Sequence, residues 1–332
     1  MYVKFSNERI LIMIGNLVNS VPLVVQILFL ILGFVLLMKG ADWFVDGASA
    51  LASKLGIPQI VIGLTIVAFG TSAPEAAVSI TSGLAGSPDL AISNVLGSNI
   101  LNVLLILGIA SVITPIAIQK NTLRYEIPFT ALITVLLLGL GLMGNSVSRL
   151  DGVIFLVLMA AFMVYLIILS KNQKPSEEDA PAKPMAIWKM IVFIIVGGAG
   201  IIFGSQFCVE SATSIATHFG MSERMIGLTI VAFGTSLPEL ITSTTAAKKG
   251  NADIAIGNVV GSNIFNILFV LGTTAVITPI KYTSAFIVDN VMALISMILL
   301  FVFVLKNKKL GRVGGIVMLA SYVAYFVFFI VL

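Results

Sequence analysis

The sequence predicts an all-α integral membrane protein with ten transmembrane helices, arranged as two inverted five-helix repeats with broken helices at the membrane midplane. Hydrophobic residues make up 58% of the 332 residues, charged residues only 10%, and the mean hydropathy is +1.11, whereas soluble proteins carry about 25% charged residues. Apolar runs of the roughly 20 residues needed to cross a bilayer follow one another along the chain. Two of these runs are near copies of each other, and each has an acidic residue in its interior.

The composition also excludes several kinds of site. Cys208 is the one cysteine, which excludes an internal disulfide and a cysteine metal cluster. His218 is the one histidine, which excludes zinc sites built on pairs of histidines. The net charge is +4, but the basic residues are scattered between apolar runs, so we expect no nucleic-acid partner. The sequence contains no visible pairing of a nucleophile with a base and no metal triad, so we expect neither an enzyme nor a cofactor.

The apolar runs define the expected spans in chain order. Residues 1–21, in which basic residues precede a short apolar run, are interpreted as an N-terminal extension rather than a signal peptide. The longest polar interruption is rich in proline and charge, which is typical of an exposed linker. We therefore expect a first five-helix repeat over 22–170, a cytoplasmic linker over 171–186 and a second five-helix repeat over 187–332. The expected helices are 22–50, 58–84, 89–113, 126–145, 150–170, 187–216, 223–247, 252–277, 284–305 and 312–332.

Basic residues set the expected orientation in the membrane. Alternate loops carry 13 of the 19 lysine and arginine residues, and by the positive-inside rule these loops are cytoplasmic. Both termini then lie on the extracellular side of the cell membrane. Because each half has an odd number of helices, the second half inserts upside down relative to the first. Inverted repeats are typical of secondary transporters, which bind their substrates near the midplane where the repeats meet.

The duplication is visible in two motifs. Residues 63–80 (GLTIVAFGTSAPEAAVSI) and 227–244 (GLTIVAFGTSLPELITST) are identical at 13 of 18 positions with an offset of 164. Residues 92–103 (ISNVLGSNILNV) and 256–267 (IGNVVGSNIFNI) match at 8 of 12 positions with the same offset. The repeated region extends over 63–115 and 227–279, and each copy ends in Thr-Pro. Chance similarity between apolar helices would not keep Gly, Pro, Ser, Asn and Glu in register.

The first motif places one carboxylate in each copy, Glu75 and Glu239, inside a membrane-spanning run. An ionisable group at that depth costs at least about 3 kcal/mol and is by default a functional-site hypothesis. Pro74 and Pro238 have no N–H, and each ring clashes with the carbonyl four residues earlier, so the helix is expected to break at Gly-Thr-Ser. Unpaired backbone is tolerated at this depth only if it is buried in protein or lines a cavity. The carbonyls freed over 68–71 and 232–235 are therefore candidate ligands for a hard cation.

The second motif adds further oxygen atoms. Ser98 and Asn102 are four residues apart and share one helix face, and Ser262 and Asn266 repeat this arrangement. Carboxylate, hydroxyl, amide and carbonyl oxygens suit Ca²⁺, which takes about 6–8 oxygen ligands. They suit Na⁺ equally and a transition metal poorly. Because two carboxylates neutralise one Ca²⁺ and several Na⁺ can occupy the same region, competition between the ions is a sufficient basis for antiport.

GTSAPE with GSNILN, and GTSLPE with GSNIFN, resemble the two α-repeats of the cation/Ca²⁺ exchanger superfamily, specifically its sodium/calcium exchanger branch of prokaryotic type. The resemblance covers the chain from about residue 22. It implies a core of the second, third, seventh and eighth helices, across which the first and sixth helices slide during alternating access. It implies that Glu75 and Glu239, with the carbonyls of Thr71 and Thr235, hold Ca²⁺. For Na⁺ it implies the same glutamates together with Ala68, Ser72, Ser98, Asn102, Ala232, Ser236 and Ser262.

Asn266 is a departure from the family pattern and a candidate ligand in its own right. Several family members, including potassium-dependent ones, have aspartate at this position, so its absence here weakens the case for potassium co-transport and leaves the Na⁺ stoichiometry open. The family nevertheless suggests electrogenic exchange. The proton/calcium branch usually has a different motif around the acidic residue, but a protonatable pair of glutamates can carry H⁺, so H⁺/Ca²⁺ antiport stays an alternative. A cation channel is a further alternative, disfavoured by the inverted repeats and buried carboxylates.

Other polar residues have simpler interpretations. Asn102 and Asn266 can also act as polar contacts between helices, and Asn94, Asn99, Asn258 and Asn263 are interpreted as packing and capping residues. Asp42, Asp46 and Glu210 are interpreted as solvated helix ends, with Lys39 near enough in sequence to pair with Asp42. Asp289 is assigned a structural role near a helix start. The expected partners are Ca²⁺, Na⁺ and membrane lipid, with no obligate protein partner.

Overall fold

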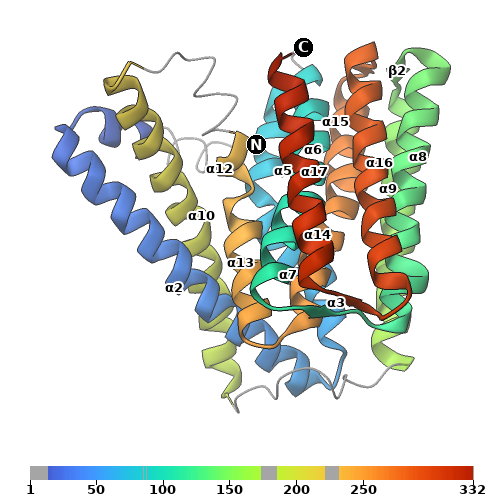
Figure 1. The fold of residues 1–332 in the computed structure, drawn as a ribbon, viewed down its shortest axis with the longest axis horizontal. Coiled ribbons are helices and arrows are strands. Elements are labelled where there is room, and N and C mark those ends of the chain that lie inside the picture. Colours follow the sequence, from blue (N-terminus) through green and yellow to red (C-terminus); the bar gives the residue numbers. More distant parts are fainter. Residues whose placement is uncertain (1–13, 85, 87, 173–184, 221–231, 332) are drawn as a thin grey trace.

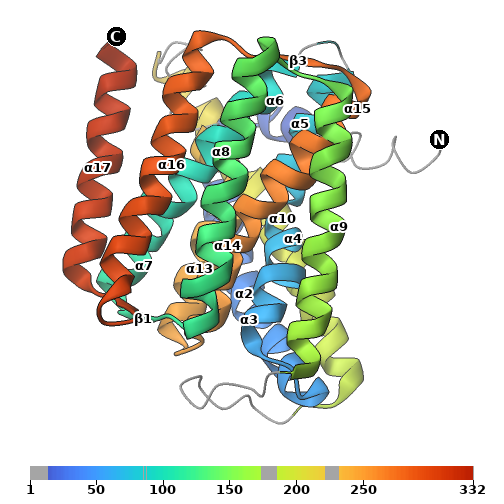
Figure 2. The ribbon, with the colours of Figure 1, turned by 90° about the vertical axis from the view of Figure 1, so that its right-hand side faces the viewer.

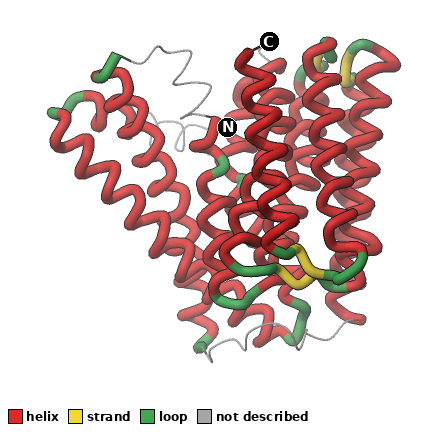
Figure 3. Tube along the Cα trace, in the orientation of Figure 1, coloured by secondary structure: helices red, strands yellow, loops and turns green. Residues whose placement is uncertain are grey.

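The computed structural model describes residues 14–84, 86, 88–172, 185–220 and 232–331. Helices account for almost all of these residues (Figure 3). Three parts of the sequence analysis lie outside the described residues: most of the N-terminal extension, most of the linker, and residues 221–231, which open the second copy of the first motif.

The first half contains two uninterrupted long helices and three spans built from shorter segments. In chain order these are α2 (Leu23–Leu55); α3 (Gln59–Ile62), the π-helical turn η1 (Gly63–Val67), α4 (Ala68–Thr71) and α5 (Ala73–Leu84); α6 (Pro88–Leu101), the π-helical turn η2 (Asn102–Leu107) and α7 (Gly108–Ile113); the π-helical turn η3 (Thr122–Glu126) and α8 (Ile127–Gly144); and α9 (Arg149–Asn172).

The second half repeats this order over its described residues. It consists of α10 (Ile187–His218); α12 (Ala232–Thr235) and α13 (Leu237–Lys248); α14 (Ala252–Phe265), the π-helical turn η5 (Asn266–Leu271) and α15 (Gly272–Ile277); α16 (Ser284–Leu305); and α17 (Arg312–Val331). The bounds of α12, α13, η5 and α15 are those of α4, α5, η2 and α7 shifted by 164 residues. The sequence duplication is therefore also a duplication of local structure over these elements, including the π-helical turns η2 and η5. The π-helical turn η3 is not repeated, because α16 is continuous over the equivalent residues.

Four two-residue strands are an addition to the all-helical prediction. β1 (Ile116–Ala117) pairs antiparallel with β4 (Lys309–Leu310), and β2 (Ser146–Val147) pairs antiparallel with β3 (Ile280–Lys281). Each pair joins one strand from each half of the chain. These small ladders tie helix ends of one half to helix ends of the other.

Seven of the described helices, with adjoining segments counted together, are long and apolar enough to cross a membrane, and the bent pair Gln59–Thr71 with Ala73–Leu84 makes an eighth candidate. A shorter apolar helix covers Arg312–Val327. This confirms a helical, multi-pass membrane protein. The most apolar stretches of Ala252–Ile277 and Pro88–Ile113 are 94% and 72% buried, against 22% for α2 and for α10. The spans that carry the second motif therefore form the centre of the molecule.

Helices α2 and α10 lie side by side along one flank and are tilted away from the other helices (Figure 1). Their close approach depends on glycine. A Cβ atom added at Gly40 would lie 2.8 Å from the carbonyl oxygen of Gly197, and one at Gly33 would lie 2.9 Å from that of Gly204. Small residues let helix backbones approach in this way, so α2 and α10 form a closely packed pair. On the opposite flank, α8, α9, α16 and α17 stand nearly parallel (Figure 2).

One lysine joins this helix pair to the central helices. Lys249, directly after α13, places its Nζ 2.8 Å from Asp46 Oδ1 and 3.4 Å from Asp42 Oδ1 on α2. It also donates to the backbone carbonyl of Asp42 at 2.7 Å. This corrects the interpretation of the two aspartates as solvated helix ends and the suggested pairing of Lys39 with Asp42. The sequence alone could not indicate Lys249 as the partner, because it lies more than 200 residues from Asp46.

Two other isolated acids also have partners. Glu210 accepts a hydrogen bond from Gln206 Nε2 at 2.8 Å, one turn away on α10, and is not simply solvated. Asp289 Oδ1 accepts a hydrogen bond of 2.7 Å from Tyr325, which joins α16 to α17. The contact of Asp289 is a structural one, made between helices rather than with its own helix end.

Candidate cation-binding site

Both copies of the first motif break their helix at the serine of Gly-Thr-Ser. Ser72 has φ −84° and ψ 7° and separates α4 from α5, whose axes differ by 53°. Ser236 has φ −93° and ψ 5° and separates α12 from α13 in the same way. The break lies where the following proline, which offers no N–H to the carbonyl four residues earlier, was expected to produce it. In the second copy that carbonyl, on Gly234, instead accepts a hydrogen bond of 2.8 Å from Ser205 on α10.

Each glutamate lies in the first turn after the break, and each is only 1% exposed. The Ser72 hydroxyl donates to Glu239 Oε1 at 2.7 Å, and the Ser236 hydroxyl donates to Glu75 Oε1 at 3.3 Å. Ser72 and Ser236 therefore each donate a hydrogen bond to the glutamate of the other half of the chain. This exchange brings the two carboxylates into one cluster of hydrogen-bonded side chains. The N-terminal ends of α5 and α13 favour the negative charges.

The central helices complete the cluster with hydroxyl groups. Ser262 on α14 donates to Glu239 Oε1 at 3.4 Å, and Ser98 on α6 lies 3.4 Å from the hydroxyl oxygen of Ser236. Residues from both motifs and both halves therefore belong to one hydrogen-bonded cluster around the two carboxylates.

Four carboxylate and amide oxygens of the predicted ligand residues are buried without a hydrogen-bond partner. They are Glu75 Oε2, Glu239 Oε2, Asn102 Oδ1 and Asn266 Oδ1. A buried polar atom left unpaired costs about 1–3 kcal/mol, and more if it is charged, so each one calls for an explanation such as a bound ion. The four atoms come in two pairs related by the offset of 164. All are oxygens, the donor type that Ca²⁺ and other hard cations prefer.

The charge at this site comes from two residues. In the described part of the chain, no three His, Cys, Asp or Glu side chains gather into a metal-binding group. The remaining candidate donors, which are hydroxyl, amide and carbonyl oxygens, are neutral. A site of this composition carries two negative charges when both glutamates are ionised.

The two threonines of Gly-Thr-Ser differ between the halves. The Thr71 hydroxyl donates to Asn258 Oδ1 at 2.9 Å, whereas the buried Thr235 hydroxyl has no hydrogen-bond partner. The carbonyl of Ala68 accepts the N–H of Ser72 at 2.9 Å and lies 3.3 Å from the Thr71 hydroxyl. It is therefore partly used by the protein itself. Ala232, its counterpart, lies at the start of α12.

Two asparagines first interpreted as packing residues support the glutamates. Asn94 Nδ2 donates to Ser79 Oγ at 3.0 Å and to the carbonyl of Glu75 at 3.4 Å. Asn258 Nδ2 makes the same two contacts in the second half, with Ser243 Oγ at 2.8 Å and the Glu239 carbonyl at 3.4 Å. The signal was present in the sequence, because each serine and asparagine recurs at the offset of 164.

Comparisons with known proteins identify the family of the chain. The family model described as "Sodium/calcium exchanger protein" matches residues 25–168 and 189–331. The chain is 34% identical to "Sodium/calcium exchanger MaX1" of Methanosarcina acetivorans, over 91% of this chain and 98% of that protein. It is 36% identical to "Inner membrane protein YrbG" of Escherichia coli, over 89% of this chain and 94% of that protein. It also resembles a solved structure of the sodium-calcium exchanger NCX_Mj with a TM-score of 0.80 and 34% identity, over 91% of this chain and 98% of that one. The chain belongs to the sodium/calcium exchanger family of membrane transporters.

Proposed function

We propose that this protein is a secondary active antiporter that exchanges Na⁺ for Ca²⁺ by alternating access at one shared midplane site. Ten transmembrane helices form two inverted repeats over 22–170 and 187–332, with a cytoplasmic linker over 171–186 and both termini outside the cell membrane. The duplicated element bounds and the reciprocal strand pairs support this arrangement. The family relationship supports sodium and calcium as the transported ions, since the names of MaX1 and NCX_Mj give them for those proteins.

The set of four unpaired, buried oxygens is the observation that carries the proposal. Two belong to carboxylates and two to neutral amides, so a bound cation would gain coordination from all four and charge from the carboxylates when they are ionised. We assign Ca²⁺ to Glu75 and Glu239 with the carbonyls of Thr71 and Thr235. We assign Na⁺ to the same glutamates and to the surrounding neutral oxygens, which belong to Ala68, Ser72, Ser98, Asn102, Ala232, Ser236, Ser262 and Asn266.

Ions of both kinds then compete for the same two charges. One Ca²⁺ neutralises both carboxylates, and so do two Na⁺, whereas any further Na⁺ bound at the neutral oxygens leaves net positive charge. Exchange is electrogenic in that case. Because Ser72 and Ser236 each contact the glutamate of the opposite half, both halves contribute to the coordination of whichever ion is bound.

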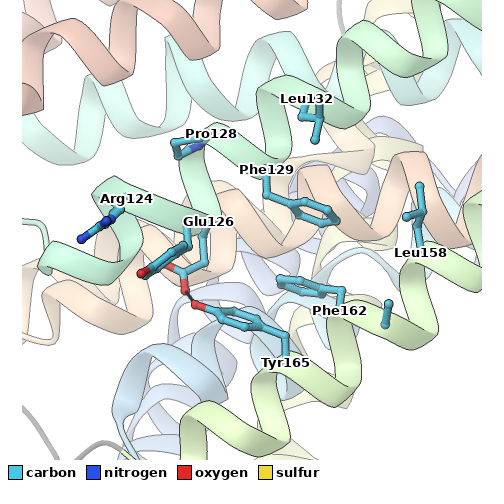
Figure 4. Close-up of a pocket in the computed structure, with 10 residues that line it drawn as sticks. Arg124, Glu126, Pro128, Phe129, Leu132, Leu158, Phe162 and Tyr165 are labelled. Atoms are coloured by element: carbon cyan, nitrogen blue, oxygen red, sulfur yellow. Dashed lines mark hydrogen bonds between the residues drawn. The ribbon is translucent and has the colours of Figure 1, made fainter.

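Reconstituted vesicles test this proposal directly. Vesicles loaded with Na⁺ should take up ⁴⁵Ca²⁺ when diluted into Na⁺-free medium, and Glu75→Gln and Glu239→Gln should each abolish the uptake. Glu126→Gln is the matched control, because Glu126 is also buried but faces Tyr165 on the far flank, where the tyrosine hydroxyl donates to it (Figure 4). Glutamine can still accept that hydrogen bond, so uptake should persist. Normal uptake in either site variant would refute the shared site.

The choice of driving ion is tested in the same vesicles. Separate gradients of Na⁺, K⁺ and H⁺ are imposed, and only the Na⁺ gradient should drive Ca²⁺ uptake. Uptake driven by a pH gradient without sodium would replace the proposal with H⁺/Ca²⁺ antiport through the same glutamates. Unitary currents in a planar bilayer would instead indicate a channel.

A further inference from the structure

We infer that Asn99 and Asn263 are positioning residues that turn the amide oxygens of Asn266 and Asn102, respectively, toward the transported Na⁺. The inference rests on the proposed function and adds two residues that do not themselves touch the ion. Its distinctive feature is that each positioning residue acts on the half of the chain to which it does not belong.

The four asparagines form a closed set of hydrogen bonds across the two halves. Asn266 Nδ2 donates to Asn99 Oδ1 at 3.1 Å, and Asn102 Nδ2 donates to Asn263 Oδ1 at 3.0 Å. Asn99 Nδ2 in turn donates to the backbone carbonyl of Asn263 at 3.3 Å, and Asn263 Nδ2 to that of Asn99 at 3.2 Å. The side chains of Asn99 and Asn263 are thus fixed by backbone, and each presents its oxygen to an amide nitrogen of the opposite half. We call Asn99 and Asn263, held in this way, the asparagine clamp.

The clamp determines which atom of the Asn102 and Asn266 amide groups stays free to bind a cation. An asparagine side chain has a donating NH₂ group and an accepting oxygen at similar distances from its Cβ atom, and only the oxygen can bind a cation. Because the clamp holds the nitrogens of Asn102 and Asn266, their oxygens point elsewhere. Both oxygens are buried without a partner in residues that are 1% exposed.

The helix periodicity places Asn102 and Asn266 on the same helix faces as the serines of the ion site. Asn102 follows Ser98 by one turn on the same face, and Asn266 follows Ser262 in the same way. Ser262 contacts Glu239 and Ser98 contacts Ser236. The π-helical turns η2 and η5 begin at these two asparagines, and such local widenings of a helix are frequent at functional sites.

The contacts predict a crossed pattern of coupling. Asn99 and Asn102 are three residues apart on one helix, and sequence spacing alone would pair them. The hydrogen bonds instead pair Asn99 with Asn266 and Asn263 with Asn102. Residues that act through a shared contact show non-additive effects, whereas independent residues show additive ones.

Double-mutant cycles measure this pattern in the full-length protein. In reconstituted vesicles, Asn99→Ala should raise the KM for Na⁺ by about fivefold, the equivalent of one neutral hydrogen bond of about 1 kcal/mol, and leave the KM for Ca²⁺ unchanged. Asn99→Ala combined with Asn266→Ala should be no worse than Asn266→Ala alone. When Asn99→Ala is combined with Asn102→Ala, the increase in the KM for Na⁺ should equal the product of the two single increases. Asn263→Ala should show the mirrored behaviour.

Several results would overturn the inference. Coupling of Asn99 with Asn102 but not with Asn266 contradicts the crossed contacts. A lowered melting temperature and lowered maximal rate with an unchanged KM for Na⁺ means that the clamp is only structural. Asn99→Leu, which keeps the number and branching of the side-chain heavy atoms, gives the same test if the alanine variant does not fold, and it should raise the KM for Na⁺ equally.

A binding assay separates failure of the clamp from failure of the proposed function. The purified protein is titrated with Na⁺ and, separately, with Ca²⁺ while its melting temperature is followed. Stabilisation by Na⁺ that weakens in Asn99→Ala supports the clamp even if the wild-type protein shows no exchange in vesicles. Stabilisation by Na⁺ at the same midpoint in both proteins refutes the clamp, whatever the exchange assay shows.

Discussion

Replacement of Lys249 by alanine should loosen the attachment of the α2–α10 pair to the central helices. Lys249 reaches Asp46 at 2.8 Å and Asp42 at 3.4 Å. The first half has no counterpart of this lysine, since the position 164 residues earlier is Ala85. The ion pairs therefore act at one end of the molecule only, which the positive-inside rule assigns to the cytoplasm. We expect them to favour the arrangement seen here over one in which α2 has shifted.

The size of this effect follows from the exposure of the three side chains. Lys249 is 26% exposed, Asp46 31% and Asp42 43%, so solvent screens both pairs. Exposed ion pairs contribute about 0.2–1 kcal/mol each, and the two pairs share one lysine, so the total is about 1 kcal/mol. A change of that size alters an equilibrium about fivefold.

Spin labels report the population of the two arrangements. Cysteines replace Leu55 on α2 and Leu305 on α16, which are 59% and 54% exposed, in a background where Cys208 is replaced by alanine. Pulsed dipolar spectroscopy then gives the distribution of distances between the labels. Lys249→Ala should raise the ratio of the shifted to the observed arrangement about fivefold, and Lys249→Arg should restore it.

Lys248→Ala is the control, because Lys248 is exposed and next in sequence to Lys249. It should leave the distribution unchanged. An identical distribution in Lys249→Ala and the unmodified protein would refute the reasoning, as would an equal change in Lys248→Ala.

Further predictions concern packing, charge and topology. Gly40→Ala places a Cβ atom 2.8 Å from the carbonyl oxygen of Gly197. It should lower the free energy of unfolding by about 1–3 kcal/mol, measured by thermal unfolding. Gly139→Ala, whose added Cβ atom has nothing within 4 Å, is the control and should be neutral or stabilising by up to about 1 kcal/mol. Asn266→Asp adds a third carboxylate and should change the sodium Hill slope or the reversal potential; if neither changes, Asn266 does not lie at the ion site. A cysteine at Lys248 should be labelled from the cytoplasmic side, and labelling from the outside only would overturn the orientation.

The sequence predicted the features that depend on local chemistry and on the repeat. Proline has no N–H wherever it stands, so the breaks before Pro74 and Pro238 could be placed without a structure. The duplicated motif singled out Glu75 and Glu239, because an acidic residue that recurs inside two apolar runs has few structural explanations. The i, i+4 spacing predicts that Ser98 and Asn102 share one helix face, and both side chains contact residues of the second half.

The partners of these residues could not be predicted, because they come from the other half of the chain. Ser72 stands three residues before Glu75 but donates to Glu239. Asn99 was interpreted as a packing residue, yet its oxygen receives the amide of Asn266. A repeat shows which residues are equivalent but not whether they contact within one half or across both. Both kinds occur at this site: Ser72 contacts the glutamate of the other half, whereas Ser262 contacts Glu239 of its own half.

The two buried carboxylates also explain why, on the proposed function, uptake of one ion would require release of the other. A buried carboxylate without a counter-charge costs several kcal/mol even after the protein relaxes, and this site has two of them, which accept hydrogen bonds from serine hydroxyl groups. The empty site is therefore expensive to enclose, whereas the site with one Ca²⁺ or with Na⁺ is not. On the proposed function, passage between the two faces requires enclosure of the site. The buried charge thus raises the barrier for return of an empty carrier, and uptake of one ion becomes coupled to release of the other without any further gate.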